Sequence, residues 1–446
     1  MPVRRTTAAL SAAAALLLAV AGCGGGGGSS SKTTTTSPAA PGPAPTTSTQ
    51  QPAPAPAQPA GLAPGLAIGL TETNASLVRA PGTGPDLPAF KPWQEKVAAL
   101  KPALYRLPID WAGLQPDPDQ PANLELPADG CMRGQQPCAP FSGVKDLLAA
   151  AKSQQQAGNG FEVMVVFFGV PEWAAAPASG CERPGIQPRS RPITARGLTA
   201  FGALVKQVAD LARQMGVDVR WWSPWNEPNG AFFISPQRHR CSTSSPPVSA
   251  AVYAKLFDAM KAELDAVPGD QRIVLGDLAG VAQGSARGAG SGEFVRALPA
   301  HVICDAQVIA QHAYADLPGQ KTRPGDPIAA TEHAVDEHAC ARDTPIWITE
   351  TGVGGLHAGD DRRTGAKSLR AQCTALDVQL KAWRKDPRIR AAFQYSFRED
   401  PAFPVGLADA GLTRDYPTYD LLKAWANRAH PDDPPPDMPS DCAQSN

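Results

Sequence analysis

The sequence predicts an α/β protein, a single (β/α)8 TIM barrel, from two observations. Eight short apolar runs, several rich in β-branched or aromatic residues, recur along most of the chain, and amphipathic stretches with helical spacing separate them. Strands that alternate with helices form parallel βαβ units, and eight such units close into one barrel. The alternative is a doubly wound open sheet, but the sequence has no glycine-rich phosphate-binding loop that would favour it.

The eight apolar runs are the predicted strands, in chain order: residues 66–70, 103–109, 162–168, 219–225, 272–275, 306–310, 346–349 and 391–397. The clearest helix is predicted over residues 195–215, because its apolar residues repeat at spacings of three and four and Gly216 follows as a stop. Residues 248–267 and 367–383 show the same pattern. These helices are expected to cover the outside of the barrel.

Three long segments follow predicted strand ends, at residues 112–141, 174–193 and 230–247. In a parallel barrel, the loops after the strands all lie at the C-terminal face, where active sites form. A functional site is therefore expected at that face.

The beginning of the chain predicts an exported lipoprotein, with a signal peptide at residues 1–22. An apolar run at residues 8–20 is too short to span a membrane as a permanent helix, and it leads into Val-Ala-Gly-Cys. This ending resembles the bacterial lipobox, which implies cleavage before Cys23 and lipid attachment to its thiol. The protein would then face the outside, extracellular or periplasmic, from the cell membrane. The alternative is an ordinary secreted protein cut nearby.

The remaining chain divides by composition. Residues 23–64 are rich in Gly, Ser, Thr, Pro and Ala and cannot bury a core, so they are predicted to be a tether. The barrel is predicted over residues 65–429, and residues 430–446 form a polar, proline-rich tail. The 41 Lys plus Arg balance 42 Asp plus Glu, so no field of one sign attracts nucleic acid or an anionic bilayer. We expect a monomer that contacts the membrane through its lipid alone.

Besides Cys23, the chain has eight cysteines, and an even number in an exported protein predicts four disulfides. The sequence leaves the connectivity open. Sequential pairing is the simplest choice: Cys131 with Cys138, Cys181 with Cys241, Cys304 with Cys340, and Cys373 with Cys442. No C-x-x-C occurs and the histidines lie at no ligand spacing relative to the cysteines, so neither a metal nor another cofactor is expected.

Two predicted strands end in a glutamate. The fourth runs into Asn226-Glu227-Pro228, where the proline forbids further ladder pairing, and the seventh runs into Glu350, with Gly352 soon after. Two carboxylates at strand ends on one face of a barrel suggest a pair that works together.

These motifs resemble the acid/base and nucleophile motifs of the retaining β-glycosidase clan with (β/α)8 barrels, which includes glycoside hydrolase families 5 and 39. Three further motifs at matching strands support the resemblance: Tyr105-Arg106-Leu107, Gln311-His312-Ala313-Tyr314 and Gly406-Leu407-Ala408-Asp409. The resemblance implies hydrolysis of β-glycosidic bonds in a polysaccharide or oligosaccharide. Glu227 would be the acid/base and Glu350 the nucleophile.

The chemistry of glycoside hydrolysis fits this assignment. One carboxyl group must protonate the leaving oxygen while another attacks the anomeric carbon, and in retaining enzymes the two lie ~5 to 5.5 Å apart. Arg106, at the barrel centre in the resembled clan, is expected to favour the ionised form of Glu350. That negative charge and the surrounding tryptophans are expected to keep Glu227 protonated.

The resemblance also implies substrate contacts. Asn226 would bind the sugar 2-hydroxyl, Tyr314 would hold the nucleophile, and His312 would line the same subsite. Trp173 and Trp225 are candidate platforms for sugar rings. Many members of the clan carry a tryptophan platform on the eighth strand, and here Phe397 or Tyr395 would replace it.

Purely structural or less specific roles are alternatives for several of these residues. Arg106 could be a buried counter-ion of Asp110, and four further acidic residues near strand ends have no supporting motif and are possible substrate contacts: Glu172, Asp277, Glu399 and Asp400. At the level of function, the alternatives are a non-catalytic surface carbohydrate-binding protein on a hydrolase scaffold, and a transglycosylase. Fold alone does not imply activity.

Overall fold

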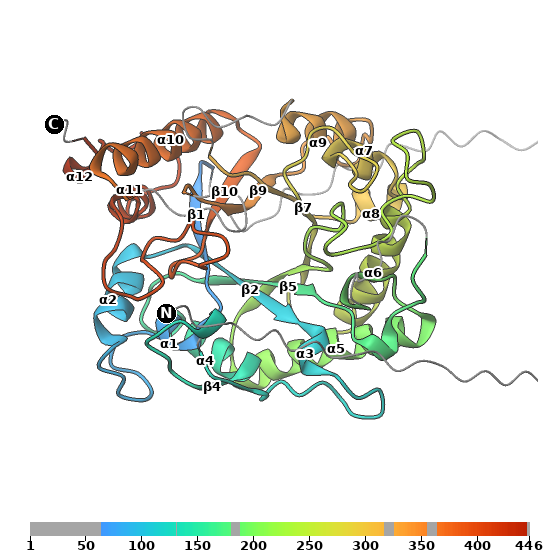
Figure 1. Ribbon diagram of the computed structural model, residues 1–446, viewed down its shortest axis with the longest axis horizontal. Helices are drawn as coiled ribbons and strands as arrows, with labels where there is room; N and C mark the ends of the chain where they lie inside the picture. The colour runs from blue at the N-terminus through green and yellow to red at the C-terminus, as the bar shows by residue number, and fades with distance from the viewer. Residues whose placement is uncertain (1–63, 131, 180–187, 316–324, 355–363, 444–446) are drawn as a thin grey trace, which may run out of the picture. The chain divides into compact units, whose positions relative to one another are not determined.

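The computed structural model describes residues 64–130, 132–179, 188–315, 325–354 and 364–443. Within them, eight parallel strands close into a barrel in the order β1-β10-β9-β8-β7-β6-β5-β2, with helices around it (Figure 1). The predicted TIM barrel is confirmed, and each barrel strand overlaps one predicted run. Their bounds are β1 (Ala67–Thr71), β2 (Leu104–Asp110), β5 (Glu162–Phe168), β6 (Val219–Ser223), β7 (Arg272–Leu278), β8 (Val308–His312), β9 (Ile346–Thr351) and β10 (Ile389–Tyr395).

The predicted helices also form. They are α5 (Ala195–Met215), α6 (Ser249–Leu264) and α10 (Ala366–Lys385). Further helices and short 3-10 turns cover the strands and loops: α1 (Ala75–Val78), α2 (Lys91–Leu100), α3 (Trp111–Leu114), η1 (Met132–Gly134), α4 (Gly143–Gln156), η2 (Glu172–Ala174), η3 (Pro188–Ser190), α7 (Ser291–Arg296), α8 (Ala300–Cys304), α9 (Pro327–Asp336), α11 (Pro417–Ala426) and α12 (Ser440–Ala443).

Helix α5 shows why the sequence folds as it does. The Thr194 side chain accepts a hydrogen bond from the Gly197 N–H and caps the first turn. Gly216 ends the helix in a left-handed conformation, with φ of 66°. Between them Phe201, Leu204 and neighbouring residues of one face are buried in the core between helices and barrel.

The interior of the barrel holds a separate apolar layer. Trp221 and Trp347 pack edge to face with ring centroids 4.5 Å apart, and Phe393 lies 5.8 Å from Trp347. The rest of this layer comes from small and aliphatic residues, nearly all on the other barrel strands: Ala67, Leu104, Met164, Val274, Val308, Ala310 and Ala391. The barrel is therefore a packed core below its mouth.

The three long segments begin after β2, β5 and β6, as predicted. The first contains α3 and a small antiparallel sheet of β3 (Pro127–Ala128) and β4 (Phe141–Ser142). The predicted signal peptide, Cys23 and the tether up to residue 63 lie outside the described residues. Among the described helices, none has the length and apolar character needed to cross a membrane.

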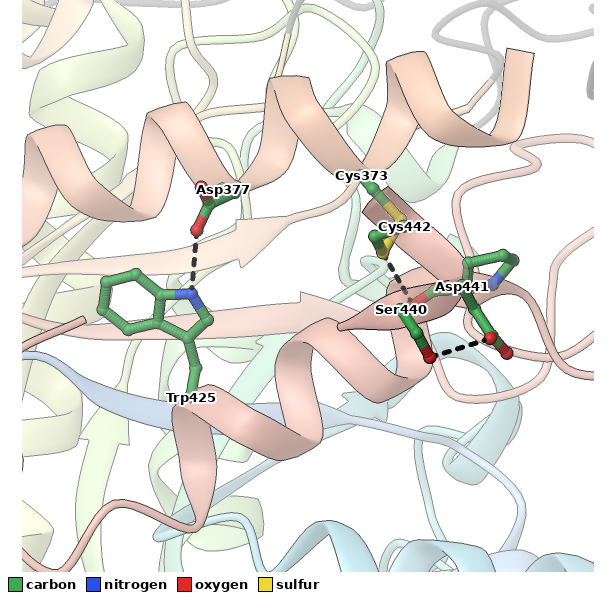
Figure 2. The surroundings of a disulfide bond; sticks show 7 residues. Cys373, Asp377, Trp425, Ser440, Asp441 and Cys442 are labelled. Carbon is green, nitrogen blue, oxygen red and sulfur yellow. Dashed lines mark hydrogen bonds between the residues drawn. A yellow bond between two sulfur atoms is a disulfide. The ribbon is translucent and has the colours of Figure 1, made fainter. Parts of the chain in front are cut away.

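Two predicted disulfides are confirmed, Cys304–Cys340 and Cys373–Cys442. The second joins α10 to α12, near a hydrogen bond from Trp425 to Asp377 that links α11 to α10 (Figure 2). The tail that follows α11 therefore packs on the barrel. Cys138 and Cys241 are also disulfide-bonded, but the partners predicted for them, Cys131 and Cys181, lie outside the described residues, so these two pairings stay predictions.

Candidate active site

Glu227 lies at the barrel mouth just beyond the end of β6. Hydrogen bonds to both neighbouring strands fix this segment, from the Asn226 N–H to the Phe167 carbonyl and from the Glu227 N–H to the Asp277 carbonyl, both 2.9 Å. Glu227 has φ of 39°, a left-handed conformation that is rare outside glycine. Such backbone persists only where its surroundings hold it, as these strands do here.

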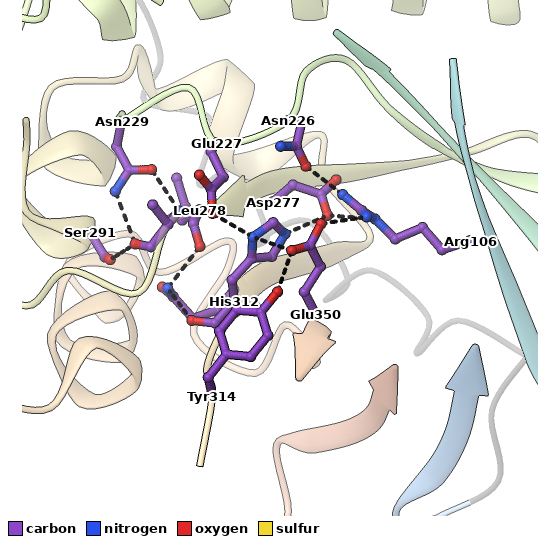
Figure 3. Close-up of polar contacts among 12 residues, drawn as sticks. Arg106, Asn226, Glu227, Asn229, Asp277, Leu278, Ser291, His312, Tyr314 and Glu350 are labelled. Atoms are coloured by element: carbon purple, nitrogen blue, oxygen red, sulfur yellow. Dashed lines mark hydrogen bonds and ion pairs between the residues drawn. The ribbon is translucent and has the colours of Figure 1, made fainter. Parts of the chain in front are cut away.

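Glu350 lies within β9 and is bound on both oxygens. Arg106 Nη1 donates to Oε1 at 2.7 Å, and the Tyr314 hydroxyl donates to Oε2 at 2.6 Å (Figure 3). Burial, together with the charge of Glu350, raises the pKa of Tyr314 well above its ordinary value, so Tyr314 keeps its proton and remains a donor. A cation and a neutral donor thus both bind this carboxylate.

His312 connects the two glutamates. Its Nδ1 lies 2.9 Å from Glu227 Oε1 and 3.4 Å from Glu350 Oε2, and its Nε2 lies 3.4 Å from Asp277 Oδ1. Burial lowers the pKa of His312, but the charges and hydrogen bonds of Glu350, Asp277 and Glu227 outweigh it and raise the pKa to about 9. At neutral pH the ring is therefore a cation that donates from both nitrogens.

The two glutamates lie close enough to act on one atom. Oxygens of Glu227 and Glu350 and a nitrogen of His312 all lie within 4.8 Å of one another. Carboxyl groups lie ~5 to 5.5 Å apart in retaining pairs and ~6.5 to 9.5 Å apart in inverting pairs, so this upper limit is nearer to the retaining arrangement. A metal would also fit three such groups by distance. A metal ligand must be a neutral imidazole, so a metal here would have to displace a proton from His312.

Asn226 and Arg106 complete the group of residues predicted from the motifs. Arg106 Nη2 donates to Asn226 Oδ1 at 2.5 Å, which orients the amide group so that its nitrogen is the side that can donate to another group. The predicted residues Arg106, Asn226, Glu227, His312, Tyr314 and Glu350 therefore meet in one place, although they come from four strands and the segments that follow them (Figure 3).

Two predicted platforms do not fit the structure. Trp225 is fully buried, where its indole N–H donates to the Phe233 carbonyl and its ring packs against Phe201. Phe397 is also fully buried, with its ring against Trp93 and Tyr419. A sugar platform needs an exposed face, so the elements packed over these rings contradict both predictions.

Other aromatic residues lie beside the nucleophile candidate. Tyr395, the alternative to Phe397, is partly buried, and both it and Tyr314 pack against Phe403, with centroids 6.0 and 5.0 Å away. Burial raises the pKa of Tyr395, and the negative charge of Glu350 raises it further. The Tyr395 hydroxyl therefore lies near Glu350. Phe403 gave no signal in the sequence, because it lies in an irregular segment.

Trp173 is partly buried and packs between loops. Its indole N–H donates to the Gln115 carbonyl, its ring meets Trp111 edge to face, and the Arg196 guanidinium lies 5.6 Å from its centroid. Packing between loops is therefore enough to explain the position of Trp173. Its role as a sugar platform stays a prediction.

Two interpretations of charged residues are corrected. Arg106 is not the counter-ion of Asp110, because Asp110 pairs with Arg189 at 2.7 Å while Arg106 pairs with Asp277 and Glu350. Asp277 is not a substrate contact either, since it is fully buried. Of the other acidic residues considered, Asp400 is paired with Arg133 at 2.8 Å.

Asp277 and Asn229 are the residues whose roles the sequence did not reveal. Asn229 binds the backbone of Ala279 and Ala289 and so ties the segment after Glu227 to the one after β7 (Figure 3). For Asp277 a signal existed: Gly276, inside an apolar run, is typical of a bulge, and the pairing of β7 with β8 shifts register there.

No protein-family model matches the sequence, and no curated protein matches it. Solved structures do resemble the chain. A conserved exported protein from Bacteroides fragilis is 10% identical, with a TM-score of 0.54 over 83% of this chain and 79% of that one. SrfJ from Salmonella typhimurium is 10% identical, with a TM-score of 0.53 over 83% of this chain and 76% of that one.

A family 39 glycoside hydrolase from the gut symbiont Bacteroides cellulosilyticus WH2 is 14% identical, with a TM-score of 0.48 over 81% of this chain. The chain spans 64% of the length of that hydrolase, less than two thirds. At such identities the likeness shows a shared fold alone, and the function must be argued from the site.

Proposed function

We propose that the protein hydrolyses β-glycosidic bonds in a polysaccharide or oligosaccharide with retention of configuration. The observation that carries this proposal is the pair Glu227 and Glu350, with oxygens within 4.8 Å at the mouth of the barrel. The asymmetry of their surroundings supports two roles. Glu350 is bound by a cation and a phenol, whereas Glu227 has the more exposed side chain, 26% against 12%.

In the proposed first step, a Glu350 oxygen attacks the anomeric carbon while the bond to the leaving oxygen breaks and Glu227 gives its proton to that oxygen. The product is a glycosyl ester on Glu350. In the second step Glu227 removes a proton from water, the hydroxide adds to the anomeric carbon, and Glu350 leaves as a carboxylate. In this proposal Asn226, whose amide oxygen accepts from Arg106, binds a sugar hydroxyl through its amide nitrogen.

The test is release of reducing sugar from β-glucan, xylan, mannan and galactan by the purified protein. Glu350→Gln should reduce kcat by about 10⁴-fold or more with folding preserved, because no other group can form the ester. Glu227→Gln should slow substrates with poor leaving groups far more than activated aryl glycosides. Glu337→Gln, at a surface ion pair with Arg296, is the matched control.

An unchanged rate in Glu350→Gln would exclude the nucleophile assignment. The anomer formed first, followed by NMR, decides the stereochemistry, and an α-product from a β-glycoside would exclude retention. Glycan binding without turnover on any substrate would instead favour a carbohydrate-binding protein, and transfer to an added sugar alcohol would favour a transglycosylase.

Export is part of the proposal. Disulfides form and persist outside the reducing cytoplasm, and the described residues contain two complete ones. We place the protein outside the cell membrane, anchored by lipid on Cys23 and tethered by residues 23–64. Loss of the protein from the membrane fraction in Cys23→Ser would support the anchor, and retention there would contradict it.

A further inference from the structure

Asp277 is a fully buried carboxylate that forms no bond in the proposed reaction. Its Oδ1 lies 3.2 Å from Arg106 Nε and 3.4 Å from His312 Nε2, and both of those side chains are 1% exposed. Its own carbonyl accepts the Glu227 N–H. A single residue therefore contacts the backbone of Glu227 and two cations, of which Arg106 binds Glu350 and His312 contacts both glutamates.

The local backbone is built to deliver this side chain. Gly276 has φ of 109° and Asp277 has φ of 49°, and the pairing of β7 with β8 shifts register between Leu275 and Leu278. A Cβ on Gly276 would lie 2.7 Å from the Ala310 carbonyl oxygen, so only glycine fits there. The bulge turns Asp277 into the barrel mouth. Strained backbone of this kind clusters at functional sites.

We infer that Asp277 is a positioning residue, whose carboxylate anchors the inner sides of Arg106 and His312 so that their outer nitrogens face Glu350 and Glu227. This assignment rests on the proposed hydrolysis for its consequence in catalysis. The anchoring itself is a property of the charged cluster and can be measured without turnover.

Charge balance explains why a fixed anion is needed. With Glu227 protonated as the acid, the site holds two cations, Arg106 and His312, and two anions, Asp277 and Glu350. When Glu350 becomes the uncharged ester, Glu227 has lost its proton, so two cations again face two anions. Buried net charge is costly, and Asp277 is the anion that stays the same through both steps.

His312 depends on this anion most directly. Its Nε2 faces the carboxylate of Asp277, while its Nδ1 faces the carboxylates of Glu227 and Glu350. An imidazole that donates from both nitrogens must be protonated. The charged and titratable groups around the ring come from β2, the segment after β6, β7, the segment after β8, and β9: Arg106, Glu227, Asp277, Tyr314 and Glu350.

The test compares the wild type with Asp277→Asn, which keeps the shape and removes the charge. NMR titration of protein labelled at histidine follows His312, assigned among the seven histidines by its loss in His312→Gln. In the wild type, His312 should stay protonated until about pH 9. In Asp277→Asn its titration should fall by more than about one pH unit, because an opposite charge at this distance is removed.

Kinetics on an aryl glycoside complete the test. We expect Asp277→Asn to lose about 10- to 100-fold in kcat/KM above pH 7 and less at pH 5, so that the alkaline limb moves to lower pH. Asp377→Asn, a buried aspartate on α10 bound to Trp425 and Lys381, is the matched control and should change neither readout (Figure 2). Asp277→Glu keeps the charge and should keep the high titration of His312.

Two results would overturn the inference. The first is a midpoint near pH 6.5 for the titration of His312 in the wild type. The second is a titration of His312 that is the same in Asp277→Asn as in the wild type. If the titration shifts as expected but the wild type hydrolyses no glycoside, the anchoring by Asp277 stands and the proposed function fails.

Discussion

The interior of the barrel and its mouth are built on the same strands but hold together in different ways. On β8, Val308 and Ala310 belong to the apolar interior layer, and His312, the next inward residue, belongs to the charged mouth. On β2, Leu104 and Arg106 differ in the same way. Two residues along one strand therefore separate a region stabilised by apolar burial from a region stabilised by mutual ion pairs.

The interior layer and the mouth differ in the substitutions that they tolerate. An apolar layer loses stability roughly with the volume removed, and its neighbours stay satisfied. A buried charged cluster loses more than the removed group, because the partners are left uncompensated in a medium of low dielectric. Function at the mouth thus depends on complete sets of partners, whereas the interior only needs to be filled.

The largest effect is expected when a buried charge at the barrel mouth is removed. Arg106→Leu removes one of the two cations that Asp277 and Glu350 share, so we expect a loss of about 3 to 5 kcal/mol in the free energy of unfolding and at least about 10³-fold in kcat. Urea unfolding and aryl glycoside hydrolysis measure the two. Arg106→Lys, which keeps the charge but not the fork of donors, should recover part of the stability. Equal stability of Arg106→Leu and wild type would contradict this account of the mouth.

Shortening a buried side chain of the interior layer should lower the stability of the fold and leave the pH dependence of catalysis unchanged. Phe393 is fully buried beside Trp347, so Phe393→Ala is expected to cost about 3 to 5 kcal/mol in the free energy of unfolding. Below the new melting temperature, the pH dependence of kcat/KM should match the wild type, and Phe393→Leu should show a smaller loss of stability. A shifted pH profile in either variant would show that the interior layer and the mouth are coupled.

The smallest expected effect is a dependence of stability on pH that comes from the mouth alone. The raised pKa of His312, about 9 against 6.5, gives stability that is complete below pH 6.5 and is lost as pH rises through 9. The pKa of Asp277 is lowered to about 2 because Arg106 and His312 outweigh its burial, so its contribution is present above about pH 3.8 and lost as pH falls through 2.

Urea unfolding at pH 6 and pH 9 tests the histidine contribution. The wild type should lose about 1 to 3 kcal/mol over that interval, and His312→Gln should lose less. An equal loss in both proteins would assign the pH dependence to other groups.

The barrel and the two glutamates could be predicted from the amino-acid sequence alone. Apolar runs, helical spacing and stop residues such as Gly216 are local signals, and they predicted all eight barrel strands and the bounds of α5. Glu227 and Glu350 were predictable because each lies at the C-terminal end of a predicted strand, and the ends of parallel strands meet at one face.

Which side chains come into contact depends on how the whole chain packs. Trp225 and Phe397 look like platforms in the sequence, but residues distant in the chain, Phe201 and Trp93, pack on their rings. The bulge at Gly276 and the closure of the barrel bring Asp277 between Arg106 and His312, which are more than two hundred residues apart in the chain but lie on strands of one mouth. Burial and partnership depend on what covers a residue from elsewhere in the chain, and local sequence carries no signal for that.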